Sequence, residues 1–226
     1  MKIENLTLAF WNKKVVDSIN LQINPGEFIF IIGHSGSGKT SLIRSIIWDF
    51  KPLTGDIFLE NGNWLYKNIS ENFLKKYRKN IWVIFQDYKL LESKTVYENV
   101  SFAMEVSNYK DREIVKKVPE ALEQVWLLLK KDKFVSELSG WEKQRVSIAR
   151  ALVHETSIII WDEPTGNLDP KTALNIMKIF DELNKSWITI IIATHDKNIV
   201  DSYQKRVITF KNKKIYSDIT PWTYNL

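Results

Sequence analysis

The chain has 226 residues, no cysteine and a formal net charge of +5. This length suffices for one α/β domain with a sizeable core, and the lack of cysteine excludes a disulfide framework. The longest apolar runs, 28–32 and 188–193, are far shorter than the roughly 20 residues that cross a bilayer. The N-terminus lacks a secretory signal, and the mild lysine excess is interpreted as a solvated surface. We therefore expect a soluble, cytoplasmic protein.

Strand-like and helix-like patterns follow one another along the chain. Apolar strand patterns are found at 3–10, 15–23, 27–32, 56–59, 81–85, 157–161, 188–193, 207–210 and 214–217. Helical patterns are found after residue 40, through most of 72–151, and at 171–184 and 197–203. Strands that alternate with helices favour a largely parallel sheet covered on both faces. The first strand pair and the helix-rich middle are expected to be additions to that sheet.

A phosphate-binding motif follows the third strand. Residues 33–40 fit G-x-x-x-x-G-K-[ST] at every position and open a helix, which is the context that a P-loop needs. Glycines let successive N–H groups point at phosphate oxygens, and the helix N-terminus adds positive potential. Lys39 would neutralise β- and γ-phosphate charge, and the Thr40 hydroxyl would coordinate Mg²⁺. The predicted ATP-binding residues here are Gly33, His34, Ser35, Gly36, Ser37, Gly38, Lys39, Thr40 and Ser41.

Two acids end the apolar strand at 157–161. Side chains that are adjacent on a strand point to opposite faces, so Asp162 and Glu163 need separate roles. Asp162 can hold Mg²⁺ through water, and Glu163 can act as the general base for an attacking water. A charged strand end capped by solvent is the alternative, which a phosphate cradle on the same sheet makes the weaker interpretation.

Further segments resemble those of ABC ATPases, and the resemblance spans essentially the whole chain. Residues 138–142, LSGWE, resemble the family signature, which binds the γ-phosphate of ATP held by the opposite subunit. Residues 167–169, NLD, resemble the D-loop. The resemblance implies an α/β P-loop NTPase of the ABC type, with an antiparallel β subdomain and a helical subdomain. It also implies a head-to-tail homodimer, and ATP and Mg²⁺ as cofactors.

The same resemblance assigns roles to single residues. Gln86 is implied to contact Mg²⁺ and the attacking water, and His195 to contact the γ-phosphate. Phe10 is implied to stack on adenine, at roughly 1–3 kcal/mol by analogy with base stacking. The remaining implied nucleotide contacts are Ser139, Gly140, Trp141 and Asp169. The His34 side chain is expected only to fill space in the loop, and His154 is expected to be a surface residue.

The domain prediction is a single ATP-binding domain over 1–226. Segments 1–85 and 151–226 would form the nucleotide-binding core with its β subdomain, and 86–150 the helical signature subdomain. Within the family, residues 33–36, 85–91, 95–100 and 162–169 resemble the FtsE-like ATPases of cell division. Their membrane partner is FtsX, so an FtsX-like permease is implied, contacting a groove at about 87–102, with the chain peripheral on the inner membrane face. An ATPase of lipoprotein release or macrolide export is the alternative.

Two other classes of function are weighed. An ATP-binding module with impaired hydrolysis is suggested by Trp141 alone. A DNA-repair or chromosome ATPase would carry a long coiled-coil insertion between P-loop and signature, and the segment between Thr40 and Leu138 has no sustained heptads. We therefore expect no nucleic-acid partner.

The tryptophan count is anomalous. The chain has 9 Trp and only 8 Gly, whereas ordinary usage of about 7% would give about 16 Gly. Trp11 occupies a turn, and Trp48 ends the P-loop helix where a left-handed residue is usually Gly. Trp64 and Trp222 are uninformative, and the positions where the family has glycine or another small residue are Trp82, Trp126, Trp141, Trp161 and Trp187. One hypothesis is that UGA codons for glycine were translated as tryptophan, and the other is a chain that is rich in tryptophan.

Overall fold

The computed structural model describes residues 1–11, 13–59, 63–67, 69–84, 89–154, 156–163 and 170–220, without the side chains of 170–172. A three-stranded antiparallel sheet in the order β2-β1-β4 is formed by β1 (Lys2–Phe10), β2 (Lys13–Gln22) and β4 (Thr54–Phe58). A six-stranded sheet has the order β5-β6-β7-β3-β8-β9. Its strands are β3 (Phe28–Ile32), β5 (Ile81–Ile84), β6 (Ile158–Asp162), β7 (Thr189–Thr194), β8 (Arg206–Lys211) and β9 (Lys214–Ile219).

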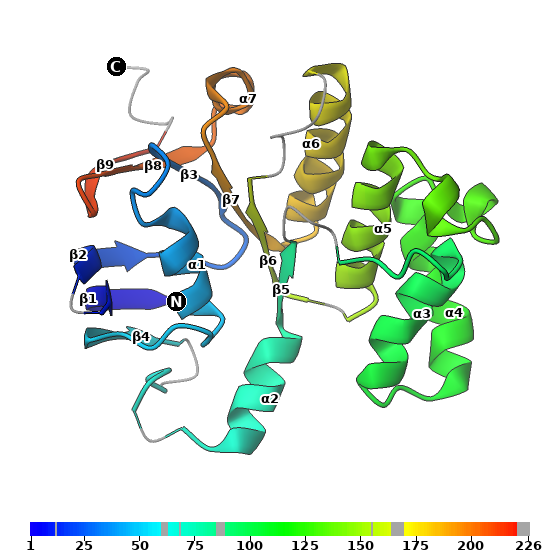
Figure 1. The fold of residues 1–226 in the computed structure, drawn as a ribbon, viewed down its shortest axis with the longest axis horizontal. Helices are drawn as coiled ribbons and strands as arrows, with labels where there is room; N and C mark the ends of the chain where they lie inside the picture. The colour runs from blue at the N-terminus through cyan, green and yellow to red at the C-terminus, as the bar shows by residue number, and fades with distance from the viewer. Residues whose placement is uncertain are drawn as a thin grey trace.

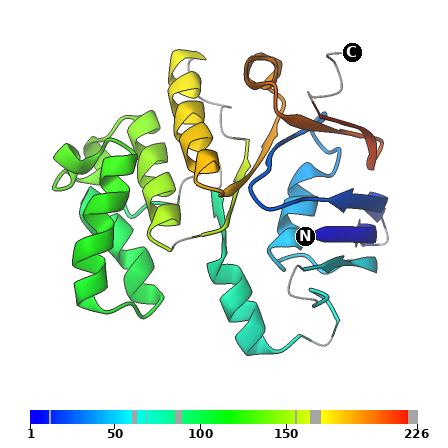
Figure 2. The ribbon, with the colours of Figure 1, turned by 180° about the vertical axis from the view of Figure 1, so that it is seen from behind.

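Helices pack around the six-stranded sheet, and a group of them lies beyond it on one side (Figure 1). They are α1 (Lys39–Ile46), α2 (Glu71–Lys79), α3 (Val96–Val106), α4 (Asp111–Gln124), α5 (Gly140–Leu152), α6 (Pro170–Lys185) and α7 (Lys197–Tyr203). Figures 1 and 2 show α3, α4 and α5 gathered on the side away from the three-stranded sheet. Within the described part of the chain, no helix combines the length and the apolar character needed to cross a membrane.

Two hydrophobic cores lie on the two faces of the six-stranded sheet. Its strands from β5 to β8 run parallel, and β9 is antiparallel to β8. Side chains alternate along each strand, so Phe28 and Phe30 enter the core shared with α3 to α7. Ile29 and Ile31 enter the other core, which includes α1 and the three-stranded sheet. Burial on both faces explains why these strands read as continuous apolar runs.

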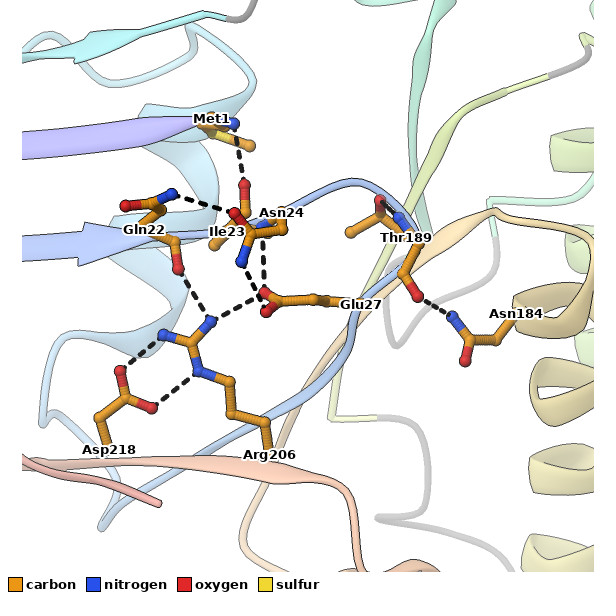
Figure 3. Close-up of polar contacts among 10 residues, drawn as sticks. Met1, Gln22, Ile23, Asn24, Glu27, Asn184, Thr189, Arg206 and Asp218 are labelled. Atoms are coloured by element: carbon orange, nitrogen blue, oxygen red, sulfur yellow. Dashed lines mark hydrogen bonds and ion pairs between the residues drawn. The ribbon is translucent and has the colours of Figure 1, made fainter. Parts of the chain in front are cut away.

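One arginine joins the start of β8 to β9 and to the turn that precedes β3 (Figure 3). The Arg206 guanidinium donates to both carboxylate oxygens of Asp218, at 2.8 and 2.6 Å. It also donates to Glu27 Oε2 at 2.8 Å and to the Gln22 carbonyl at 2.8 Å. Its bidentate geometry suits a planar guanidinium, and it fixes the end of the antiparallel β2 against the parallel sheet.

The structure confirms the predicted order of strands and helices and the α/β architecture. The predicted strands at 3–10 and 15–23 correspond to β1 and β2, and the helix at 197–203 has the bounds of α7. Element ends move by one or two residues elsewhere, as is usual for helix and strand boundaries. The parallel register of β3 with β7 and β8 could not be read from the sequence, because it depends on how distant segments pair.

The expectation that His154 is a surface residue is wrong. His154 is only 8% exposed, and its ring stacks on Trp82, with ring centroids 4.9 Å apart. It lies just after α5, where β5 and Tyr109 cover it. Burial, together with the cations Lys79, Arg150 and Lys117, lowers the pKa of His154 from 6.5 to about 4.

This burial predicts a pH-dependent stability. Between pH 6.5 and about 4 the unfolded chain binds a proton at His154 that the folded chain does not, so the free energy of unfolding should fall as the pH drops through that window. Above pH 6.5 the residue is neutral in both states and has no effect. Urea unfolding at pH 7, 6 and 5 measures the slope, and His154→Phe should flatten it while keeping a ring on Trp82. An unchanged slope in His154→Phe would contradict this account.

Candidate active site

The P-loop, Glu163 and His195 lie at the carboxyl ends of three neighbouring strands. Residues 33–40 follow β3, Glu163 follows β6 and His195 follows β7, and the sheet order places β6, β7 and β3 side by side. The register pairs Ile32 with Thr194 and Asp162 with Ala193. The sheet therefore brings together side chains that are more than 100 residues apart in sequence. Such strand ends are where open α/β sheets bind their ligands.

The loop between β3 and α1 forms a narrow phosphate-sized cradle. Residues 35–41, with Val15 and Glu163, line a cavity of about 240 Å³. Gly38 has φ 114°, and a Cβ built there would lie 2.6 Å from the Val15 carbonyl oxygen. Gly36 has φ 74° with open space around it. These glycines are required by backbone conformation, and at Gly38 also by close approach of β2.

The Lys39 ammonium lies within this loop. Lys39 is only 5% exposed. Its Nζ donates to the Gly33 carbonyl at 2.8 Å and to the His34 carbonyl at 3.3 Å. Glu163 Oε1 is 3.6 Å away. Since a buried ammonium is costly without anionic partners, the loop presents a strong attraction for phosphate oxygens.

Glu163 and His195 form a pair at the mouth of the cradle. His195 Nδ1 lies 2.6 Å from Glu163 Oε2. Glu163 has φ 55° and donates its backbone N–H to the Ala193 carbonyl at 2.8 Å. A left-handed conformation is uncommon for a residue other than glycine and is found at functional sites. The backbone of β7 therefore holds the carboxylate where Lys39 and His195 can both contact it.

Asp162 has the features of a metal-supporting carboxylate. Burial raises its pKa and outweighs the hydrogen bond from Thr40, which lowers it. Its Oδ1 is buried and has no hydrogen-bond partner among the described residues, and the same is true of Ser37 Oγ in the cradle. Hard oxygen ligands beside a phosphate site are what Mg²⁺ prefers. These orphaned oxygens fit a magnesium ion, with the Thr40 hydroxyl and Asp162 supporting it.

The signature-like segment begins α5, at an exposed surface. Ser139 donates its backbone N–H and its Oγ to Glu142 Oε2, at 2.9 and 2.8 Å. Burial raises the pKa of Glu142, but the hydrogen bonds from Lys130 and Ser139 outweigh it and hold this pKa below its usual range. A Cβ at Gly140 would meet no atom within 4 Å. The N-terminus of α5 is thus pre-formed and open to a partner molecule.

The signature residues do not line the cradle of their own chain. The apolar residues of α1 belong to one core of the six-stranded sheet, and those of α5 belong to the core on the opposite face. Trp141 lies over the Arg145 guanidinium, with the ring centroid 3.9 Å away. The P-loop helix α1 and the signature helix α5 therefore pack on opposite faces of the six-stranded sheet.

Phe10, Gln86 and Asp169 are not part of this cluster of site residues. Phe10 is 40% exposed and stacks on Phe50, with centroids 4.2 Å apart, so an aromatic platform exists beyond the cradle. Gln86 and Asp169, like the rest of the predicted D-loop, lie outside the described residues. The roles assigned to Gln86 and Asp169 stay predictions.

Sequence reasoning missed one lining residue. Val15 borders the cavity and its carbonyl lies against Gly38. Nothing in the residue type signals this role, since it depends on where β2 crosses the P-loop. The Phe50 ring under Phe10 is a second such case.

Comparisons with known proteins agree with this arrangement. A sequence model of the ABC transporter family matches residues 16–166. The chain belongs to the ABC transporter family. A solved ABC-family structure, cbiO1 of the cbiONQ transporter complex from Clostridium perfringens, is 35% identical, with a TM-score of 0.89 over 98% of this chain and 88% of that one. A dimeric ATP-binding cassette, MJ0796, in a post-hydrolysis state bound to ADP and Pi, is 30% identical, with a TM-score of 0.83 over 97% and 98%.

Similar proteins of assigned function show which members of the ABC family this chain resembles. The cell division ATP-binding protein FtsE of Bacillus subtilis is 42% identical over 91% of this chain and 89% of that protein. The FtsE protein of Mycobacterium tuberculosis is 40% identical over 95% and 92%. A methionine import protein, MetN of Carboxydothermus hydrogenoformans, is 38% identical over 97% of this chain and 68% of that protein. The predicted ABC family, ATPase fold and FtsE resemblance are confirmed.

The state of Asp162 leads to a prediction. Asp162→Asn removes a carboxylate whose ionised form burial disfavours, so stability at pH 7.5 should rise, by no more than about 1 kcal/mol because the site is partly open to screening solvent. Affinity for ATP in magnesium should fall about 10–100-fold, the scale of losing a metal-supporting group. Thermal melts and ATP titrations with magnesium or EDTA measure both. Asp201→Asn, on the exposed face of α7, is the matched control, and equal magnesium dependence in both variants would contradict the assignment.

Proposed function

We propose that this chain hydrolyses ATP as the ATP-binding subunit of an FtsE-type membrane complex. The observation that carries the proposal is the meeting of Lys39, Glu163 and His195 at three adjacent strand ends, over one phosphate-sized cavity. These are a phosphate-binding cation, a carboxylate that can act as base and an imidazole that contacts it. The family match and the FtsE relatives support the same function.

The volume of the cradle supports the phosphate groups of a nucleoside triphosphate as its ligand. A cavity of about 240 Å³ is smaller than the sites that enclose whole drug-sized ligands, about 300–1,000 Å³. It can hold the phosphates, which leaves the base and ribose outside. The stacked pair Phe10 and Phe50, with Phe10 exposed, provides a surface on which adenine can stack.

Phosphate binding would rearrange the charges around Lys39. The ammonium has two carbonyl acceptors and the Glu163 carboxylate as neighbours. A γ-phosphate in the cradle gives Lys39 a stronger anionic partner, which frees Glu163 from that contact. A bound Mg²⁺, supported by Thr40 and Asp162, would neutralise developing phosphate charge.

Glu163 then serves as general base, with His195 positioning it. A carboxylate next to the γ-phosphate can accept a proton from an attacking water. His195 Nδ1, at 2.6 Å, restricts the carboxylate to an orientation toward the cradle. Gln86 is proposed to complete the contacts to water and Mg²⁺, and Asp169 those across the interface.

Hydrolysis is proposed to require a head-to-tail dimer. The Ser139–Gly140 segment begins a helix on the sheet face opposite α1 and does not line the cradle, and Gly140 has open space where a Cβ would stand. A symmetric dimer would place each signature on the ATP of the other chain. The cassette structures MJ0796, described as dimeric, support this arrangement. We further propose segments 1–85 and 151–226 as the nucleotide-binding core and 86–150 as the signature-bearing part.

One observation favours a second candidate, an ATP-binding module with impaired hydrolysis. Trp141 is the second residue of α5 and lies over Arg145. An indole next to Gly140 would obstruct close packing of an opposing nucleotide, at about 1–3 kcal/mol or more. In this case ATP would bind to the monomer while turnover stayed low.

A single substitution tests the proposed role of Glu163. Glu163→Gln should lower steady-state ATP turnover by about 10²–10⁴-fold, the size of a lost general base, while ATP binding persists. Because ATP then survives at the interface, the variant should accumulate as an ATP-dependent dimer in size-exclusion chromatography. Glu123→Gln, the same change on the exposed face of α4, should leave both properties unchanged. Equal turnover in Glu163→Gln and the parent chain would remove Glu163 from its role.

A membrane partner is proposed to bind at a groove between α1, α2, β5 and α5. This groove has a volume of about 590 Å³, and its lining includes Ile47, Arg78, Val83, Lys89 and Arg150. It mixes apolar walls with three basic side chains and one acidic one, Asp49, and this positive balance suits an amphipathic helix with acidic residues. The earlier expectation placed this surface at 87–102. There Leu90 and Tyr97 pack partly on the core, while Leu91 and Phe102 are exposed.

Charge reversal tests this groove. Arg78→Glu should reduce co-purification with an FtsX-like membrane protein about tenfold or more, because like charges would then face each other. ATP turnover of the isolated chain should stay within about twofold of the parent, since Arg78 lies on α2 and does not line the cradle. Arg112→Glu, on the exposed part of α4, is the matched control. Equal losses in both variants would point to net charge, which would contradict the groove as docking site.

A further inference from the structure

Tryptophans occupy backbone positions that suit glycine. The structure describes eight of the nine tryptophans, and four of these eight have left-handed φ angles: Trp11 at 45°, Trp48 at 60°, Trp126 at 55° and Trp187 at 66°. Only a few per cent of non-glycine residues adopt such angles, and bulky residues do so rarely. Half of the described tryptophans therefore occupy a conformation that their side chain disfavours.

Two of the four close a Schellman motif, the helix ending in which glycine is the usual residue. At the end of α1, Trp48 donates its N–H to the Ser45 carbonyl at 3.0 Å and Asp49 donates to Arg44 at 2.8 Å. At the end of α4, Trp126 donates to Glu123 at 2.9 Å and Leu127 donates to Leu122 at 2.8 Å. In each motif the tryptophan is the residue that must be left-handed.

The other two left-handed tryptophans, Trp187 and Trp11, also lie where the chain turns. Trp187 follows α6 and donates its N–H to the Asn184 carbonyl at 2.9 Å, as the corresponding residue of a Schellman motif does. Trp11 lies in the two-residue connection between β1 and β2, where Phe10 pairs with Lys13. Such hairpin turns favour residues that accept a positive φ.

The indoles of Trp11 and Trp187 gain little from burial. Trp11 is 99% exposed and Trp187 is 78% exposed. An exposed indole contributes little hydrophobic free energy with which to offset a strained backbone. The end of α3 provides a comparison, because Asn108 has φ 59° and closes the same pair of hydrogen bonds, from Asn108 to Glu105 and from Tyr109 to Met104. Asparagine tolerates this conformation, whereas tryptophan has no local hydrogen bond to support it.

We infer that positions 11, 48, 126 and 187 are glycine in the protein as its source cell makes it. A UGA codon that the cell reads as glycine, and that is translated here as tryptophan, accounts for both the four φ angles and the presence of 9 Trp beside only 8 Gly. The inference rests on backbone geometry and composition, and it is independent of the proposed ATPase function.

The exchange would also alter the surroundings of the signature. Arg145 lies beneath two indoles, 4.9 Å from the ring of Trp126 and 3.9 Å from that of Trp141. Glycine at 126 removes the first of these cation–π contacts, and the same codon at 141 would remove the second. The tryptophan-containing chain therefore carries at least one indole over Arg145, that of Trp126, which the inferred glycine chain lacks.

Stability measurements test the backbone argument with matched pairs. Trp48→Gly, Trp126→Gly and Trp187→Gly should each raise the unfolding midpoint by about 2–4 °C over the corresponding Trp→Ala variant, because alanine removes the indole without relieving the left-handed strain. Trp64→Gly, at a described position without a positive φ, should instead be no more stable than Trp64→Ala. Glycine variants that are no more stable than alanine variants at 48 and 126 would overturn the inference.

Peptide mass spectrometry and the gene decide the inference even where a variant fails to fold. Peptides of the protein purified from its source cell should show glycine at the four positions, and the gene should carry UGA there. Tryptophan in those peptides, or UGG codons at positions 48, 126 and 187, would overturn it. Neither readout depends on ATP, so failure here is distinguishable from failure of the proposed ATPase.

Discussion

The candidate site depends on the placement of one buried positive charge, the Lys39 ammonium. It is enclosed by its own loop, with the Gly33 and His34 carbonyls as acceptors and the Glu163 carboxylate 3.6 Å away. Two carbonyls and one carboxylate at that distance compensate a buried ammonium only in part. The loop is thereby prepared for phosphate oxygens, and the charges that would assist hydrolysis are already beside it.

The parallel sheet turns this local feature into a site. Because β6, β7 and β3 are neighbours, their carboxyl ends place Asp162, Glu163 and His195 around the loop. Two cores fix the sheet from both faces, and Arg206 ties β8 and β9 to the turn before β3. The signature helix packs on the face opposite α1. This separation is the physical reason for proposing a dimer in which each chain supplies one half of the catalytic unit.

Local motifs could be predicted from the sequence, whereas contacts between distant segments could not. The P-loop and the acids that end β6 follow from short-range rules, as does the left-handed φ of 60° at Trp48. The 2.6 Å contact of His195 with Glu163 depends on strand order. The Phe10–Phe50 stack depends on how the loop after α1 returns to β1. His154 was misassigned because nothing near it in sequence reveals that Trp82 and Tyr109 cover it.

The central claim is that the loop around Lys39 binds the terminal phosphates of ATP together with magnesium. Isothermal titration calorimetry of the folded chain with ATP, in magnesium and in EDTA, tests it most directly. The account predicts magnesium-dependent binding that weakens by about tenfold or more in Lys39→Ala, since a charge-assisted contact is lost. Binding heats that are the same with and without magnesium, or the same in Lys39→Ala as in the parent chain, would contradict it.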